Sequence, residues 1–351
     1  MNWLDFEVIL IACITACACV IPGTFLVLRG VALMSDAISH AVLLGIVILF
    51  LIVHDLHSPY LMFGATIAGV LTVLFTEWII KTHCLKKDAA IGLIYPLFFS
   101  IGVLLISCFA RNAHLDLDMI FLGDLAYAPF NRLSIAGFDC GPLACVVMGG
   151  ILTINTLFTT LFYKELSVSI FDPIFAQLIG IQPTLFYYAL MLLTSITTVG
   201  AFDVVGAIVV IALMITPPAT ALLLTSHLPK VIGISVTISI IDSILGYTMA
   251  ALWDVSIAGS IATMSGVCFL LALLFSPQKG LIAHFVWQRK QRLQMLQRIL
   301  FTFLKEKKSI SITSASRQLG WNQQKIKNIA HSIMQKNAAI ELNNDILSIQ
   351  K

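Results

Sequence analysis

The sequence predicts an all-α membrane protein with about nine transmembrane helices, followed by a small domain of helices and a hairpin. Hydrophobic residues make up 59% of the 351 residues and charged residues only 11%, whereas about 25% of a soluble domain is charged. Apolar segments of about 20 residues, the length that crosses about 30 Å of hydrocarbon, recur up to residue 276. Beyond that point the sequence becomes polar and basic.

The apolar segments predict a membrane domain over residues 1–276. Several contain Gly or Pro, which spanning helices tolerate where neighbouring helices or a cavity satisfy the freed backbone groups. The loop at 110–140 is Asp-rich and has room for a short interfacial helix. In chain order the predicted spans are 8–28, 32–54, 60–80, 91–109, 141–162, 184–200, 204–225, 230–252 and 256–275.

The distribution of charge predicts the orientation. Residues 1–276 have a net charge of −7, whereas residues 277–351 have a net charge of +10. Because Lys and Arg concentrate in cytoplasmic loops, we expect a cytoplasmic C-terminus and, with nine spans, an extracytoplasmic N-terminus. Arg111 and Arg132 fall on the side opposite to the other loop cations, which are Lys81, Lys86, Lys87, Lys164 and Lys230.

The basic tail predicts a cytoplasmic domain of its own. Residues 288–306 have an amphipathic pattern, with an apolar face formed by Leu293, Leu296, Leu300 and Phe303. Two shorter helices are predicted at 314–319 and 322–335, and 339–349 predicts a strand, a tight turn and a second strand. Residues 288–351 therefore resemble a small winged-helix domain.

Two ionisable residues in the second predicted span form the clearest candidate site. Asp36 and His40 are four residues apart, so they share one face of a helix, and His40 lies about 4.5 Å from the middle of the span. Ionisable side chains inside a membrane are costly and mark functional sites, and a carboxylate with an imidazole suits Zn²⁺, Mn²⁺ or Fe²⁺. The structural alternative is that Asp36 caps the helix and His40 hydrogen-bonds to a neighbouring helix. Two ligands do not complete a metal shell, so a second chain or water must add others.

Three further polar residues are weaker candidates for the same metal path. Ser39 directly precedes His40, and Asp203 and Asp242 fall in or near later spans. The glycines at 198–206 suggest a broken helix around Asp203. Each acid either lines the path or sits at the end of a span and faces water.

The segment at 164–180, between the fifth and sixth spans, is the second informative region. Asp172 can cap a short helix that has Pro173 at its first position. Such a helix suits docking against another protein, although a plain interfacial turn is the simpler interpretation. The sequence contains no Gly-x-x-x-x-Gly-Lys-Ser/Thr loop, so this chain does not bind and hydrolyse ATP by that route. We expect no catalytic residues and no permanently bound cofactor.

Taken in order, these segments resemble the integral-membrane permease family of ATP-binding-cassette importers for zinc, manganese and iron. The most specific motif of that family is an Arg, a short apolar stretch, Asp-Ala, Ser-His-Ala and then Gly, and residues 29–45 are similar to it. Leu44 replaces the usual Pro of the motif, and the tail exceeds the usual length of the family. Further similar elements lie at 88–92, 121–124, 171–180 and 205–217.

The resemblance implies a permease dimer, of identical or different chains, in the bacterial cytoplasmic membrane. It also implies two partner subunits that bind and hydrolyse ATP, and an extracytoplasmic metal-binding protein that delivers Mn, Zn or Fe as the transported substrate. Asp36 and His40 would line the metal path. The stroke of the ATPase would reach the permease through Asp172, Pro173, Ala176 and Gly180.

Two other functions are compatible with the residues. A secondary metal transporter driven by an ion gradient needs no ATPase, but the 164–180 segment favours the permease. A membrane-tethered regulator would act through the tail, whose charge suits nucleic acid and also suits an anionic membrane surface. Nucleic-acid binding is the less favoured function of the tail.

Overall fold

The protein divides into two compact units, a membrane unit, Met1–Leu273, and a C-terminal unit, Leu274–Lys351. The first contains the apolar segments and the second contains the basic tail. The computed structural model describes residues 3–54, 60–109, 125–135, 138–277, 280–307, 309–334, 340–343 and 346–349.

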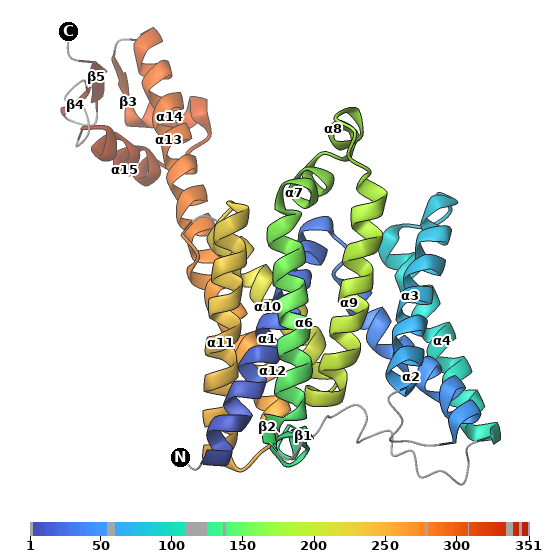
Figure 1. The fold of residues 1–351 in the computed structure, drawn as a ribbon. Coiled ribbons are helices and arrows are strands. Elements are labelled where there is room, and N and C mark those ends of the chain that lie inside the picture. Colours follow the sequence, from blue (N-terminus) through green and yellow to red (C-terminus); the bar gives the residue numbers. More distant parts are fainter. Residues whose placement is uncertain are drawn as a thin grey trace. The chain divides into compact units, whose positions relative to one another are not determined.

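The prediction of a multi-pass membrane protein is confirmed. Among the described residues, nine helices are long and apolar enough to cross a membrane (Figure 1). Their bounds agree with the predicted spans to within a few residues. The largest differences are that α1 begins at Trp3 rather than at residue 8 and that α9 ends at Val205 rather than at residue 200. The helices are α1 (Trp3–Arg29), α2 (Leu33–Val53), α3 (Tyr60–Lys81), α4 (Lys87–Phe109), α6 (Leu143–Leu161), α9 (Pro183–Val205), α10 (Ala207–Leu224), α11 (Leu228–Trp253) and α12 (Ile257–Phe275).

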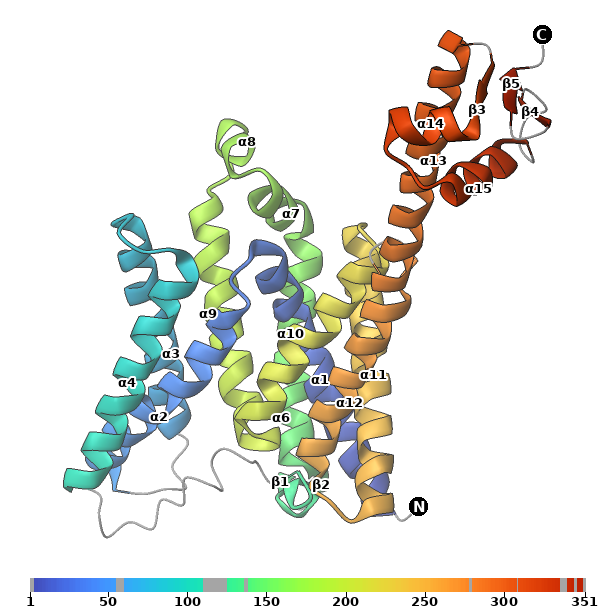
Figure 2. The same cartoon turned by 180° about the vertical axis from the view of Figure 1, so that it is seen from behind.

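Helix α1 is the centre of the membrane unit, where it packs against α6, α9, α10 and α11. Asn155 of α6 joins three helices, because its buried amide donates to the carbonyl oxygen of Ala18 at 3.0 Å and to the hydroxyl of Thr197 at 2.8 Å. Bonds of this kind hold helices together in lipid, where hydrophobic burial does not drive association. The helices α2, α3 and α4 form a group beside α9 (Figures 1 and 2).

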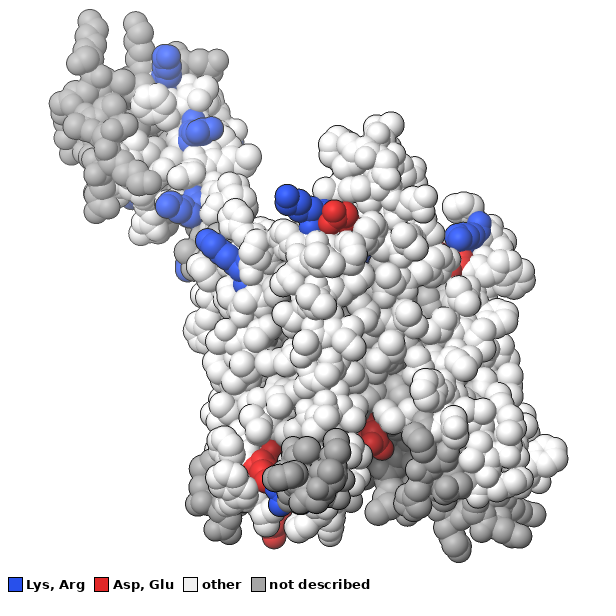
Figure 3. All heavy atoms as spheres, viewed as in Figure 1, with Lys and Arg blue, Asp and Glu red and all other residues white. Residues whose placement is uncertain are grey.

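Short elements lie at the two ends of the membrane unit. Helices α7 (Tyr163–Phe171) and α8 (Pro173–Leu178) follow α6 at one end, and Lys and Arg side chains concentrate at this end (Figure 3). The opposite end has a 3₁₀ turn, Ala128–Phe130, and the antiparallel strands β1 (Arg132–Ile135) and β2 (Phe138–Pro142). Within the predicted loop at 110–140, the segment 110–124 lies outside the described residues, and so does the motif at 121–124.

A close contact between two glycines orients α2. A Cβ on Gly45 would collide with the backbone carbonyl of Gly64 on α3, and a Cβ on Gly64 would come within 2.6 Å of the carbonyl oxygen of Gly45. The two backbones therefore touch at a place where only glycine fits. At 3.6 residues per turn, Asp36 is about 180° and His40 about 140° around α2 from Gly45. The glycine contact therefore turns both side chains away from α3.

The helix α8 begins as the sequence predicts. The Asp172 carboxylate accepts a hydrogen bond from the backbone N–H of Phe175 at 2.9 Å, and Pro173 occupies the first helical position. The cap satisfies an N–H group that has no partner within the helix. A second helix, α7, fills most of the segment before the cap, which the sequence analysis treated as a loop.

The described residues of the C-terminal unit form three helices and a three-stranded sheet of order β3-β5-β4. Its core contains Leu300, Leu304, Ile312 and Ile329. The predicted helices and hairpin are present, but Leu293 is exposed and does not belong to the apolar face that was predicted for it. The elements are α13 (Leu281–Lys307), β3 (Ser309–Ser311), α14 (Ile312–Leu319), α15 (Gln323–Met334), β4 (Ile340–Asn343) and β5 (Ile346–Ile349).

We expect the substitution Gly45→Ala to destabilise the protein, because the added methyl group forces α2 and α3 apart. Overpacking of this kind costs about 1–3 kcal/mol. Gly149→Ala on α6 is the matched control, since a Cβ there meets no described atom within 4 Å. Thermal unfolding in detergent measures the difference, and an unchanged midpoint for Gly45→Ala would contradict the constraint.

We expect Asp172→Ala to loosen α8 by about 1 kcal/mol, because the first turn loses its side-chain acceptor. The backbone amide of Phe175 then exchanges with deuterium about fivefold faster. Asp172→Asn keeps an acceptor oxygen and should remain close to the wild type. Hydrogen exchange followed by mass spectrometry of the peptides around α8 measures this, and equal rates in all three proteins would refute the cap.

Candidate functional site

A tight turn leads the chain from α1 into α2. Gly30 has a φ of +70°, a left-handed conformation that glycine adopts without strain. The guanidinium of Arg29 lies 4.2 Å from the ring centroid of Tyr187 on α9. The Ser35 hydroxyl donates to the carbonyl oxygen of Ala32 at 2.9 Å. These contacts fix the start of α2, where the candidate pair lies.

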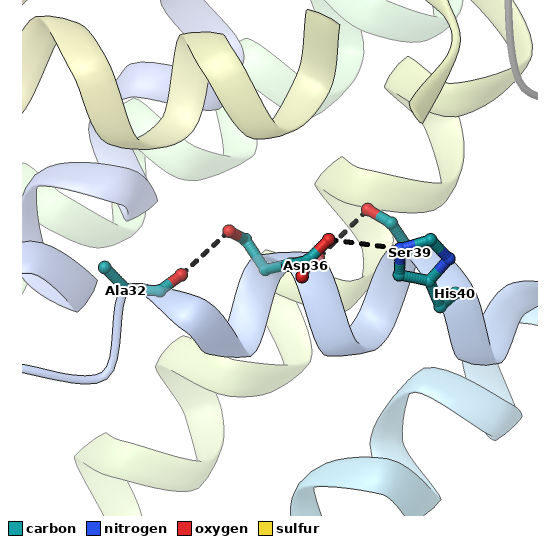
Figure 4. A network of polar contacts seen from close by, with 5 residues as sticks. Ala32, Asp36, Ser39 and His40 are labelled. Carbon is teal, nitrogen blue, oxygen red and sulfur yellow. Dashed lines mark hydrogen bonds and ion pairs between the residues drawn. The ribbon is translucent and has the colours of Figure 1, made fainter. Parts of the chain in front are cut away.

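Asp36 and His40 meet along one side of α2, as the sequence predicts (Figure 4). The Nε2 atom of His40 lies 3.3 Å from Oδ1 of Asp36, and the side chains are 31% and 28% exposed, respectively. Asp36 is in the first turn of α2, where the positive end of the helix dipole stabilises a carboxylate. Both side chains therefore belong to a membrane-spanning helix, and both remain partly exposed on one side of the chain.

Two aromatic residues of α4 position the imidazole. The ring of Tyr95 is stacked on His40 with a centroid separation of 5.4 Å. Phe99 presents its edge to the same imidazole at 5.8 Å. Because Tyr95 and Phe99 are four residues apart, they share one face of α4. Neither residue was predicted from the sequence, although two aromatic residues at this spacing within a predicted span were a visible signal.

The separation within the pair fits joint binding of one metal ion. A metal about 2.1 Å from both the Asp36 oxygen and the His40 nitrogen would make an angle of about 104° with them. That angle lies between the values for tetrahedral and octahedral sites, so it does not select one metal. Within the part of the chain that the structure describes, no cluster of three or more His, Cys, Asp or Glu residues exists. The pair therefore supplies two ligands and leaves the remaining positions to other molecules.

Of the weaker candidates, Ser39 lies beside the pair on α2, whereas Asp203 and Asp242 lie on other helices. Ser39 is 1% exposed, and its hydroxyl donates to the Ser35 carbonyl at 2.9 Å. Asp203 is exposed in the last turn of α9, which continues through the predicted break and ends before Gly206. Asp242 is fully buried near the middle of α11 rather than at its end. It lies near Ser265 of α12, although neither carboxylate oxygen meets hydrogen-bond geometry with a described residue.

The helix α8 presents apolar side chains outward. Ile174 is 74% and Leu178 is 80% exposed, and Phe175 beside them is also exposed. Ala176 is fully buried and packs inward, and Gly180 ends the segment with a φ of +85°. The large apolar side chains that α8 exposes, Ile174, Phe175 and Leu178, are therefore not the residues selected from the sequence, of which Asp172 and Pro173 are also exposed and Ala176 is buried.

Comparisons with known proteins show the family of this chain. The model of the ABC 3 transport family matches residues 4–276. The chain is 46% identical to the zinc transport system membrane protein TroD of Treponema pallidum, over 83% of this chain and 79% of that protein. It is 40% identical to the manganese transport system membrane protein MntD of Bacillus subtilis, over 80% of this chain and 95% of that protein.

A solved structure is similar as well. PsaBC from Streptococcus pneumoniae, in complex with Fab, matches with a TM-score of 0.66 and 27% identity, over 80% of this chain and 94% of that chain. With its family match over residues 4–276 and its relatives of 40–46% identity, this chain belongs to the ABC 3 transport family.

Proposed function

We propose that this chain is the membrane-spanning permease subunit of an ATP-driven importer for a divalent transition metal. The observation that carries the proposal is the Asp36–His40 pair, a carboxylate and an imidazole 3.3 Å apart within a spanning helix. The relatives named for zinc and manganese support a substrate of this class. Carboxylate and imidazole ligands discriminate poorly among Mn²⁺, Fe²⁺ and Zn²⁺.

The partly exposed flank of the pair supports a path between two permease chains. A second chain, identical or different, would face α2 and close the site together with water. Transport then proceeds by alternating access, in which two halves rock around a central site. A site with few protein ligands suits transport, because an ion that binds too tightly is not released.

The apolar face of α8 supports docking of an ATP-binding subunit. Exposed Ile174 and Leu178 offer a hydrophobic contact, and Asp172 and Pro173 keep the helix short and rigid. The partner subunit hydrolyses ATP, and the movement that accompanies hydrolysis is passed to the permease through the contact with α8. The concentration of basic residues around α7 and α8 supports a cytoplasmic position for this end. The opposite end then faces an extracytoplasmic metal-binding protein, across the bacterial cytoplasmic membrane.

The C-terminal unit is proposed to be a winged-helix-like module on the cytoplasmic side. The order of its elements supports this, since α14 and α15 are joined at Gly320 and are followed by the antiparallel pair β4 and β5. A regulator that acts through this unit is not favoured over the permease, because the family match lies in residues 4–276. A secondary transporter is also not favoured, because it works without an ATP-binding subunit and so does not explain the exposed apolar face of α8.

We expect Asp36→Asn and His40→Gln each to lower ATP-dependent metal uptake by on the order of 100-fold, because each removes a ligand. Uptake of radioactive Mn²⁺ or Zn²⁺ into proteoliposomes that contain the whole complex measures this, and size-exclusion chromatography checks assembly. The matched controls are Asp254→Asn and His331→Gln, since both residues are exposed. Wild-type uptake in either test variant would remove the pair from the path, and uptake without ATP would favour a secondary transporter.

We expect Ile174→Asp or Leu178→Asp to reduce copurification of the ATP-binding subunit by about tenfold or more, because a charge replaces an apolar contact. Val255→Asp, an exposed apolar position at the opposite end of the membrane unit, is the control. Full retention of the ATPase by both α8 variants would exclude α8 as the docking helix.

A further inference from the structure

The helix α13 has two halves of different character. In its second half, Leu296 and Phe303 pack against the core of the C-terminal unit, and Leu300 and Leu304 are fully buried in it. The preceding residues, from Leu281 to Arg292, do not belong to any described core cluster. The first half is therefore a helical segment whose large side chains are not covered by this unit.

The first two turns of α13 expose apolar and aromatic side chains. Phe285 is 69% and Trp287 is 55% exposed, and Leu281 and Ile282 are exposed beside them. The last spanning helix, α12, ends at Phe275, only a few residues before α13 begins. The apolar turns therefore emerge close to the membrane surface, at the depth where Trp is enriched in membrane proteins.

The next turn of the same helix is basic. Arg289, Lys290 and Arg292 are all exposed, and Arg289 and Arg292 line a shallow pocket together with Phe285 and Gln288. Between residues 255 and 305 the sequence contains no Asp or Glu. The acid of α13 is Glu306, fourteen residues beyond Arg292, so these cations have no acidic residue near them along the helix. Apolar turns followed directly by cations match the order of acyl chains and headgroups in a leaflet.

We propose that the first half of α13 lies in the membrane interface and binds anionic lipid. Phe285 and Trp287 enter the boundary of the acyl chains, while Arg289, Lys290 and Arg292 contact the phosphates of the headgroups. The contact holds the start of the C-terminal unit at the leaflet from which α12 emerges. Anionic lipid is favoured over nucleic acid as the partner, because binding to nucleic acid does not explain why Phe285 and Trp287 are exposed.

Quenching of Trp287 fluorescence by brominated acyl chains tests the proposal. The full-length protein is placed in nanodiscs of phosphatidylcholine, with or without about one third of phosphatidylglycerol, a lipid with an anionic headgroup. The signal of Trp287 is the difference between the wild type and Trp287→Phe. We expect brominated lipid to quench this signal at least about twofold in the anionic discs and clearly less in the zwitterionic discs.

Neutralising the basic turn separates lipid binding from simple proximity. We expect the triple variant R289Q/K290Q/R292Q to lose the extra quenching in anionic discs, because each cation near such a surface contributes about a fivefold preference. The matched control R298Q/K305Q/R317Q removes three exposed cations from the rest of the unit. This control should keep the extra quenching of Trp287 in anionic discs. An unquenched Trp287, or equal loss in both triple variants, would overturn the proposal. The proposal would also be overturned if R289Q/K290Q/R292Q kept the extra quenching but lost binding of a labelled DNA duplex.

Discussion

The contact between Gly45 and Gly64 determines which way α2 faces, and the candidate site depends on that orientation. Where two backbones touch, neither helix can rotate without a collision, so the contact fixes the rotation as well as the distance. Asp36 and His40 lie on the far side of α2 from this contact. A larger residue at either glycine would move the ionisable pair even though it touches neither side chain.

The position of α4 completes this arrangement. Tyr95 and Phe99 enclose the imidazole of His40 from one side, so the ring has few orientations available. The carboxylate of Asp36 lies at the positive end of the α2 dipole. The two groups are thus held by different means, one by aromatic packing and one by the helix start, and both remain accessible from the same flank.

Much of the fold follows from the sequence, because lipid imposes length and hydropathy on every spanning helix. The pair at Asp36 and His40 was predictable for the same reason, since ionisable residues stand out in an apolar segment. Other features depend on contacts between distant segments and were not predictable. The strand β3 is only three residues long, and it forms because it pairs with β5. The apolar spacing that began at Leu293 did not show which turn of α13 contacts α15. The break lies at Gly206, within the segment 198–206 where it was predicted, but the sixth span was predicted to end at 200, whereas α9 continues through Gly200 and Asp203 to Val205.

The junction between α9 and α10 consists of Gly206 alone, with a φ of +81°. Two helices joined by one residue have little slack, so a movement of α9 reaches α10 through the backbone torsions of Gly206 alone. At its other end α9 contacts α7 and α8, about 35 Å away along the helix axis. A displacement of that end would therefore carry α9 and Asp203 as one rod, and Gly206 is the single joint at which α10 can follow or pivot.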